Sequence, residues 1–247
     1  MLRIFSFIIC LTVLSLLMAG NKTLAYTLTH RGGNGSNLNS SVSEIIPTAQ
    51  KQIALTFDDG PTLDETSQIL DVLKEYEAKA TFFLVGSRVE RYQDIVRREV
   101  EEGHEIANHT YHHLICQPGV SMDQLRKDIK LAQNSIIRVS GYKPHLFRPV
   151  QGFYNKQLLK VLEDEGLQMV LWSPEQDSWD WDRPGVSHIV KTVLNHVNSG
   201  DIILLHDHVN GKSDTISALK IILPELKRQG FEFVTVSELL KNQELKD

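Results

Sequence analysis

Seven short apolar runs alternate with helix-like stretches along this 247-residue chain, and this alternation constrains the fold more than any other sequence feature. Each run has the length of a buried β-strand, and apolar residues at helical spacing follow it. Repeated strand–helix units predict a parallel sheet covered by helices. The expected strands are Gln52–Phe57, Ala80–Val85, Glu105–Ala107, His145–Arg148, Gln168–Trp172, Asp201–His206 and Phe231–Thr235.

The helices between these runs have recognisable ends. Ser121 is a good N-cap for a long helix that ends at Gly141, and Ser87 is expected to cap a continuous helix over 88–102. An open doubly wound sheet and a closed or incomplete barrel both fit this order. In both architectures the functional groups lie at the carboxyl ends of the strands.

The first 25 residues have the pattern of an export signal, with a basic start, an apolar stretch over 4–20 and small residues before Tyr26. An uncleaved membrane anchor is the alternative, because the apolar stretch is just long enough to span a bilayer. Residues 26–49 are rich in Gly, Ser and Asn and predict a flexible linker. One domain over 50–247 remains, secreted or associated with the cell envelope.

Charge and cysteine content exclude some partners. The formal net charge is −5 without a basic block, which argues against nucleic acid as a partner. Signal cleavage removes Cys10 and leaves Cys116 with no disulfide partner. We expect Cys116 to be a small buried apolar residue.

Reactive residues follow the first and third strands. Asp58 and Asp59 are adjacent carboxylates, which repel each other unless a cation lies with them. His109 and His113 stand four residues apart, a spacing that brings two imidazoles to one side of a helical turn. With Asp59 they form a set suited to zinc or another divalent first-row metal. A pair of His109 and His112 is the alternative.

Further candidates follow the later strands. A buried Arg148 would hold a carboxylate in place, and Gly152 permits close approach of the backbone to a ligand. Trp179 and Trp181 lie in an acidic loop and indicate contact with the apolar face of a sugar ring, with one of the two taken as structural. His206 would protonate a leaving group if a carboxylate kept it charged.

These residues together resemble the polysaccharide deacetylase family, the NodB-homology domain of carbohydrate esterase family 4. The resemblance covers approximately residues 50–240 and rests on five motifs in the family's order. It implies a distorted (β/α) barrel of about seven parallel strands with outer helices, which selects between the two architectures. The motifs are Thr56-Phe57-Asp58-Asp59-Gly60-Pro61, His109-Thr110-x-x-His113, Arg148-Pro149-x-x-Gly152, Asp177-x-x-Asp180-Trp181 and Leu204-x-His206.

The resemblance implies a role for each catalytic residue. Asp58 would be the general base, oriented by Arg148. His206 would be the general acid, with its charge sustained by Asp180. The implied metal is Zn²⁺, with Co²⁺ or Ni²⁺ as alternatives, and its ligands would be Asp59, His109 and His113. The substrate-binding residues would be Gln151, Gly152, Trp181 and Leu204, of which Trp181 and Leu204 would surround the acetyl methyl group.

The chain departs from the family pattern in two places. Val150 and Gln151 replace the usual Pro and Tyr of the third motif, although Gln151 keeps the backbone N–H that would contact the oxyanion. The loop before Asp180 is about two residues longer than the common pattern. Glu175 is therefore an alternative to the assigned aspartate.

The resulting hypothesis is a metal-dependent hydrolase of N-acetyl groups on N-acetylglucosamine-type residues of a cell-wall or extracellular polysaccharide, with release of acetate. The alternatives are an O-acetyl esterase of the xylan type and a non-catalytic carbohydrate-binding protein on the same fold. The catalytic reading is favoured because every key position of the motifs is filled.

Overall fold

The computed structural model describes residues 42–48 and 50–244. All strand pairings among the named strands of this part are parallel, in the order β1-β6-β5-β4-β3-β2-β7, and β8 pairs with the start of β2. All seven predicted strands are present. The strands are β1 (Val42–Ser43), β2 (Gln52–Asp58), β3 (Ala80–Leu84), β4 (Glu105–Asn108), β5 (Leu146–Phe147), β6 (Gln168–Val170), β7 (Ile202–His206) and β8 (Glu232–Phe233).

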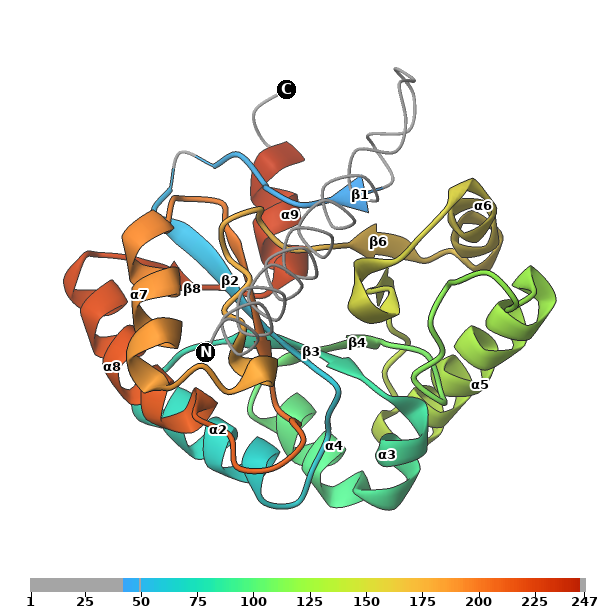
Figure 1. The fold of residues 1–247 in the computed structure, drawn as a ribbon, viewed down its shortest axis with the longest axis horizontal. Coiled ribbons are helices and arrows are strands. Elements are labelled where there is room, and N and C mark those ends of the chain that lie inside the picture. The colour runs from blue at the N-terminus through green and yellow to red at the C-terminus, as the bar shows by residue number, and fades with distance from the viewer. Residues whose placement is uncertain (1–41, 49, 245–247) are drawn as a thin grey trace, which may run out of the picture. The chain divides into compact units, whose positions relative to one another are not determined.

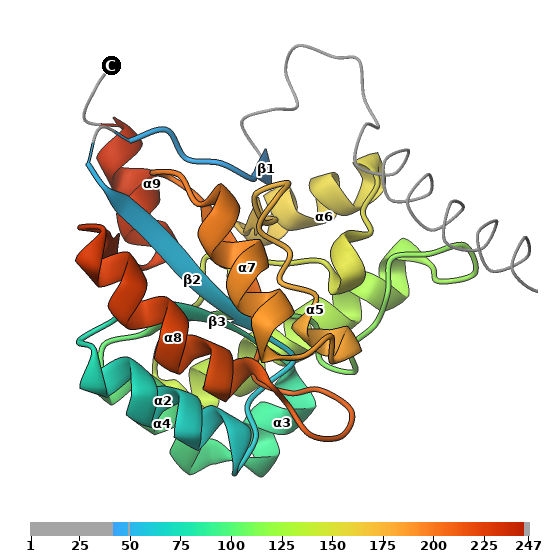
Figure 2. The ribbon, with the colours of Figure 1, turned by 60° about the vertical axis from the view of Figure 1, so that its left-hand side comes forward.

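Helices surround the outside of the curled sheet, as Figures 1 and 2 show. They follow the strand order, because α7 contacts α8, α8 contacts α2, α2 contacts α4, α4 contacts α5 and α5 contacts α6. The expected distorted barrel of parallel strands is thus confirmed, and the sheet has the form of a half-barrel. The α-helices are α2 (Glu65–Glu75), α3 (Gly86–Arg91), α4 (Gln93–Glu101), α5 (Met122–Ser140), α6 (Lys156–Glu165), α7 (Val186–His196), α8 (Thr215–Arg228) and α9 (Val236–Glu244).

Alternation along β2 divides the buried residues into two layers. Ile53, Leu55 and Phe57 belong to the large cluster beneath the outer helices. Ala54 points to the inside of the barrel, where it packs in a second cluster with residues of α9. Thr56 and Asp58 have the same parity as Ala54, so both polar side chains face the barrel interior.

The barrel closes irregularly between β6 and β7. Instead of a regular strand, the segment after β6 runs beside β7, where the Ser173 N–H donates to the Ile202 carbonyl and the Leu204 N–H donates to the Gln176 carbonyl. A single parallel bridge joins Asp177 to Leu204. This closure leads directly into the short 3₁₀ turn η3 (Asp180–Asp182).

Two local expectations differ from the structure. The helix expected over 88–102 is split at Tyr92, whose φ of −122° and ψ of 50° interrupt the helical conformation between α3 and α4. Ser87 is not the cap, because α3 begins at Gly86 and the N–H of Ser87 donates to the Tyr111 carbonyl. By contrast, Ser121 caps α5 in a capping box, and Gly141 ends it in the left-handed conformation.

The ordered domain begins earlier than the expected Gln50. β1 lies within the segment expected as a linker and pairs with β6. The predicted signal over 1–25 lies outside the described residues, as do positions 26–41 and 49 of the expected linker. None of the helices in the described part is long and apolar enough to cross a membrane. Cys116 is buried, as expected.

Candidate active site

The acidic turn lies at the carboxyl end of β2. Asp58 is the last residue of the strand and faces the barrel interior, and Asp59 has a φ of 77°. This left-handed residue turns the chain so that both carboxylates lie at the barrel mouth. A Cβ at Gly60 would lie 1.9 Å from Oδ2 of Asp207, so the turn has room only for glycine at that position.

Asp59, His109 and His113 come together in a group of possible metal ligands. Oδ1 of Asp59 lies 3.3 Å from Nε2 of His109 and 2.9 Å from Nε2 of His113, and the three ligand atoms lie within 4.8 Å of one another. Burial opposes ionisation of Asp59, but hydrogen bonds from both histidines hold the pKa of its carboxyl well below its usual range. A permanently ionised carboxylate beside two imidazoles fits a divalent cation.

The tautomer of His109 also suits a metal ligand. Its Nδ1 lies 2.8 Å from the backbone oxygen of Arg148, which can only accept a hydrogen bond. Nδ1 therefore carries the proton and donates it to that carbonyl. In neutral His109, Nε2 is then the nitrogen that can bind a metal, and outer hydrogen bonds impose this kind of orientation on metal-binding histidines.

The two histidines are brought together by a loop and not by the helical turn expected from their spacing. Thr110 and His113 have φ values of 65° and 57°. The N–H of Leu114 donates to Oγ1 of Thr110 at 2.9 Å, which closes the loop on itself. Positive φ is uncommon outside glycine, and such positions concentrate at functional sites.

His112, the alternative partner of His109, points elsewhere. Its Nδ1 lies 2.5 Å from Oδ1 of Asp128 on α5. Oδ2 of the same carboxylate accepts the backbone N–H groups of Tyr111 and His112 at 2.7 and 3.0 Å. Asp128 therefore holds the loop that presents His113, and the structure selects His113 over His112 as the neighbour of Asp59.

Arg148 is completely buried inside the barrel. Its Nη1 donates to Oδ1 of Asp58 at 2.7 Å and to Oγ1 of Thr56 at 2.8 Å, and its other nitrogens donate to the carbonyls of Val170 and Leu171. These bonds fix the guanidinium, which in turn fixes one oxygen of Asp58. The other oxygen, Oδ2, lies 3.9 Å from Nε2 of His109, at the metal-ligand group.

His206 lies opposite Asp58, because the two residues are Cα partners in the β2–β7 register. Nδ1 of His206 lies 2.7 Å from Oδ1 of Asp180, and Oδ2 of Asp180 accepts the backbone N–H of His206 and the hydroxyl of Thr215. Burial alone would lower the pKa of His206, but the charge of Asp180, its hydrogen bond and the nearby Asp59 raise it to about 10. With Nδ1 bonded to Asp180, Nε2 is the atom available to donate a proton.

The longer loop leaves Asp180 in the place that the sequence assigned to it. Glu175 is exposed, and its Oε2 lies 3.4 Å from Nδ1 of His196, so it is not the partner of His206. The remaining assignments concern substrate contact. Leu204 is buried beside Thr56, Gly152 is buried, and Gln151 and Trp181 are exposed. The assignment of these four residues to substrate binding stays a prediction.

Sequence reasoning missed the residues that support the site from neighbouring elements. Asp128 and Thr215 both lie on helices, where one acidic or hydroxyl residue does not stand out from the solvent-facing positions. Thr56 forms part of the first motif, but its contact with Arg148 becomes visible only when the barrel interior is known.

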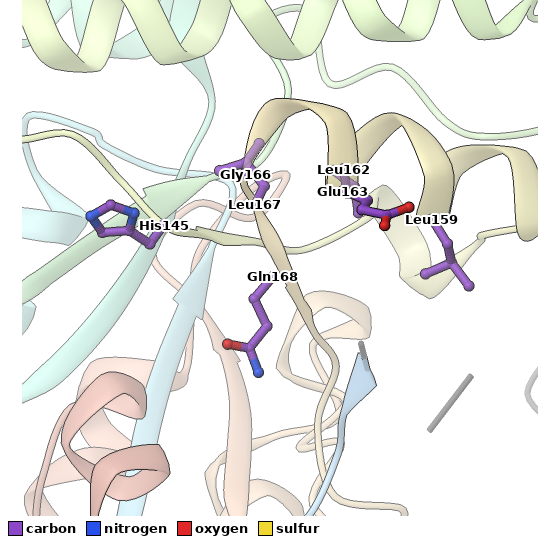
Figure 3. Close-up of a pocket in the computed structure, with 7 residues that line it drawn as sticks. All are labelled: His145, Leu159, Leu162, Glu163, Gly166, Leu167 and Gln168. Atoms are coloured by element: carbon purple, nitrogen blue, oxygen red, sulfur yellow. The ribbon is translucent and has the colours of Figure 1, made fainter. Parts of the chain in front are cut away.

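A separate hollow of about 410 Å³ lies at the other end of the strands. His145 before β5, residues of α6 from Leu159 onward, the turn after α6 and Gln168 at the start of β6 line it, as Figure 3 shows. It shares no residue with the group around Asp59. The reactive side chains therefore gather at the carboxyl ends of the strands, and this hollow is distinct from them.

Comparison with known proteins agrees with this geometry. Residues 46–170 match the family model for polysaccharide deacetylase. The chain is 48% identical over 196 residues to a peptidoglycan-N-acetylglucosamine deacetylase of Bacillus cereus, covering 79% of this chain and 91% of that enzyme. The crystal structure of the Bc1960 peptidoglycan N-acetylglucosamine deacetylase matches with a TM-score of 0.77 at 36% identity, covering 81% of this chain and 93% of that one. A family 4 acetyl xylan esterase from Clostridium thermocellum, solved with a cobalt ion, matches with a TM-score of 0.72 at 38% identity, covering 77% and 91%.

Proposed function

Because this chain belongs to the polysaccharide deacetylase family, we infer that it is a hydrolase that removes N-acetyl groups from the N-acetylglucosamine residues of peptidoglycan. One structural observation carries this function. A fixed carboxylate, Asp58, and a charged imidazole, His206, are Cα partners on adjacent strands beside a group of metal-ligating side chains. Amide hydrolysis needs a base for water and an acid for the departing amine, and this arrangement supplies both.

Asp59, His109 and His113 are the residues that would hold the metal. Their donor atoms lie close together, and two imidazoles with one carboxylate leave coordination positions open. A bound divalent metal supplies Lewis-acid polarisation of a carbonyl group and lowers the pKa of a water molecule. We propose zinc, which suits this donor set, and a family esterase of similar structure holds cobalt.

Two residues of the chain carry out the two proton transfers. Asp58 accepts a proton from the attacking water, and Arg148 keeps its carboxylate aimed. The backbone N–H of Gln151 donates to the oxyanion that develops on the acetyl oxygen. His206 gives a proton to the leaving nitrogen, so that acetate and a free amine result. Asp180 stabilises the imidazolium before transfer.

The site of action is proposed to be outside the cytoplasm, at the cell wall. The pattern of residues 1–25 is that of an export signal. A substrate in peptidoglycan requires the same location. The substrate-contact roles of Gly152, Trp181 and Leu204 belong to this proposal, with Trp181 and Leu204 around the acetyl methyl group.

An O-acetyl esterase is the second candidate, because an acetyl xylan esterase of this family shares the fold at 38% identity. The two functions are separated by measuring acetate from N-acetylated peptidoglycan and from acetylated xylan with the same metal-loaded full chain. The proposed function predicts a clear preference for peptidoglycan, with one free amine formed for each acetate. Release from acetylated xylan alone would contradict it.

A further inference from the structure

Two tryptophans beside the candidate acid are exposed and packed on each other. Trp179 and Trp181 are 43% and 45% exposed, and their ring centroids lie 5.5 Å apart with an interplanar angle of 38°. Two indoles left half in water at the mouth of a site indicate a surface for a ligand.

The loop holds the backbone of Trp179 and the indole of Trp181 in place. Asp177 accepts the backbone N–H of Trp179 at 3.0 Å, and the Trp181 side chain also hydrogen-bonds to Asp177. Between the two tryptophans, Asp180 is fully buried and bonded to His206. Asp180 lies between the two tryptophans in the sequence and binds His206. It therefore sets the position of the tryptophan pair relative to the proton donor.

The backbone supports the same conclusion. Trp179 has a φ of 59°, in the left-handed region that a bulky residue seldom adopts. This conformation is strained for such a residue and persists only where the surroundings impose it. This conformation leaves a tryptophan, the largest type of side chain, partly exposed to solvent, where it contributes little to the stability of the fold.

We propose that Trp179, backed by Trp181, forms an aromatic platform that stacks against the sugar ring adjacent to the residue being deacetylated. This inference rests on the proposed function, since that function makes the substrate a polymer whose neighbouring rings must cross the rim of the site. A pyranose ring presents an apolar C–H face to an indole. Its hydroxyl groups suit the polar residues of the same loop, Asp182 and Arg183, which are exposed.

The platform is distinct from the acetyl-group contact assigned to Trp181. That contact concerns the methyl of the reacting group, and buried Leu204 would share it. Trp179 would bind the glycan chain itself, so its contribution should depend on the number of rings in the substrate. Chain-length dependence is therefore the property that tests the proposal.

The experiment compares kcat/KM of metal-loaded full-length protein on an N-acetylglucosamine pentamer and on the methyl glycoside of N-acetylglucosamine, which has no neighbouring ring. Trp179→Ala should lower the pentamer-to-monomer ratio of kcat/KM by about 3- to 10-fold, mainly through KM for the pentamer, as expected for one aromatic stacking contact. Trp179→Phe should recover most of that ratio. Ile221→Ala, which removes an exposed apolar side chain from α8, is the matched control and should leave the ratio unchanged.

An unchanged pentamer-to-monomer ratio in Trp179→Ala would overturn the platform. This holds whether kcat/KM stays the same on both substrates or falls equally on both, and the equal fall marks a role in folding or chemistry. Failure of the proposed function looks different, because the unsubstituted protein would then release no acetate from either substrate or from peptidoglycan.

Discussion

The carboxylate of Asp58 is held by a single buried cation and is otherwise directed at the metal-ligand group. Arg148 bonds one oxygen at 2.7 Å, and burial of both side chains removes the water that would screen this pair. A carboxylate in this setting is restricted to one orientation. At the residue scale, this orientation distinguishes the proposed base, Asp58, from its neighbour Asp59.

Replacement of this base separates catalysis from metal binding. Asp58→Asn keeps the shape of the side chain and removes its ability to take a proton, so acetate release should fall by at least about 10²-fold. Metal content, measured by elemental analysis after dialysis, should stay near that of the unsubstituted protein because the three proposed ligands are intact. A variant that retained full activity would rule out Asp58 as the base.

The pH dependence of kcat/KM tests the assignment of His206 as the general acid. Asp180 raises the pKa of His206 to about 10, so His206 stays protonated at neutral pH and loses its proton only as the pH rises through that value. Asp180→Asn removes the charge that raises this pKa. The alkaline limb of the kcat/KM profile should therefore move to lower pH. Both proteins are compared with metal bound, because a nearby cation lowers the pKa of His206 in each. An alkaline limb at the same pH in both would contradict the assignment.

The location of most candidate site residues at one rim could be predicted from the sequence, because each follows a strand that ends there, and their roles stay predictions. The choice between His112 and His113 could not, since spacing alone allows both. It depends on Asp128, which lies on another element and binds the His112 ring. The sequence also leaves two candidates, Asp180 and Glu175, for the partner of His206. The structure excludes Glu175, because its carboxylate lies beside His196.

At the scale of elements, pairing between β2 and β7 aligns two motifs. Thr56 is opposite Leu204, and Asp58 is opposite His206. Because alternate residues of a strand face the same side, the two-residue spacing in each motif directs both members into the barrel. The loop after β4 depends in the same way on α5, through Asp128.

Loss of that support should weaken metal binding without removing a ligand. Asp128→Ala leaves two backbone N–H groups and the His112 ring without their acceptor, and we expect metal affinity to fall by about 10- to 100-fold. Isothermal titration with zinc measures the change. His112→Ala, which keeps both backbone bonds, is the control and should have the smaller effect. Equal affinity in Asp128→Ala and the unsubstituted protein would show that α5 does not position the loop.

Elements were predictable where the pattern is local. Ser121 and Gly141 mark the ends of α5, and a capping box and a left-handed residue are found there. The break at Tyr92 was not predictable, because apolar residues continue at helical spacing across it. β1 was also missed, since two residues in a Ser- and Asn-rich stretch carry no strand pattern and pair only because β6 offers a free edge.

On the scale of the whole molecule, one buried group opposes folding. Glu99 on α4 is fully buried, and neither of its carboxylate oxygens has a hydrogen-bond partner within the described residues. Burial and the nearby Asp207 raise its pKa well above the usual value. The folded state therefore binds a proton more tightly than the unfolded chain. The cost of burying Glu99 is therefore smallest at acid pH and grows as the pH rises from the usual carboxyl pKa towards the raised value.

An apolar residue of similar length should relieve this cost. Glu99→Met should raise the free energy of unfolding at pH 7 by about 1–3 kcal/mol, the usual cost of an unsatisfied buried polar group. The gain should shrink at pH 4, where the carboxyl is protonated in both states. Urea denaturation at the two pH values measures this difference. A variant less stable than the unsubstituted protein at pH 7 would contradict the account.

The overall architecture was predictable as repeated strand–helix units, but its closure was not. Open and closed sheets share one order of elements, and the resemblance to a known family decided between them. The irregular closure beside β7 depends on hydrogen bonds from residues 173–178, which have no strand pattern of their own.

The central claim is that one bound divalent cation, held by Asp59, His109 and His113, enables this chain to remove acetyl groups from peptidoglycan. The most direct test is acetate release from purified peptidoglycan, measured while zinc is titrated into the chelator-treated full-length protein. Activity should rise in proportion to bound metal and reach its plateau at one ion per chain. Acetate release that is complete without bound metal, or absent at full occupancy, would contradict it.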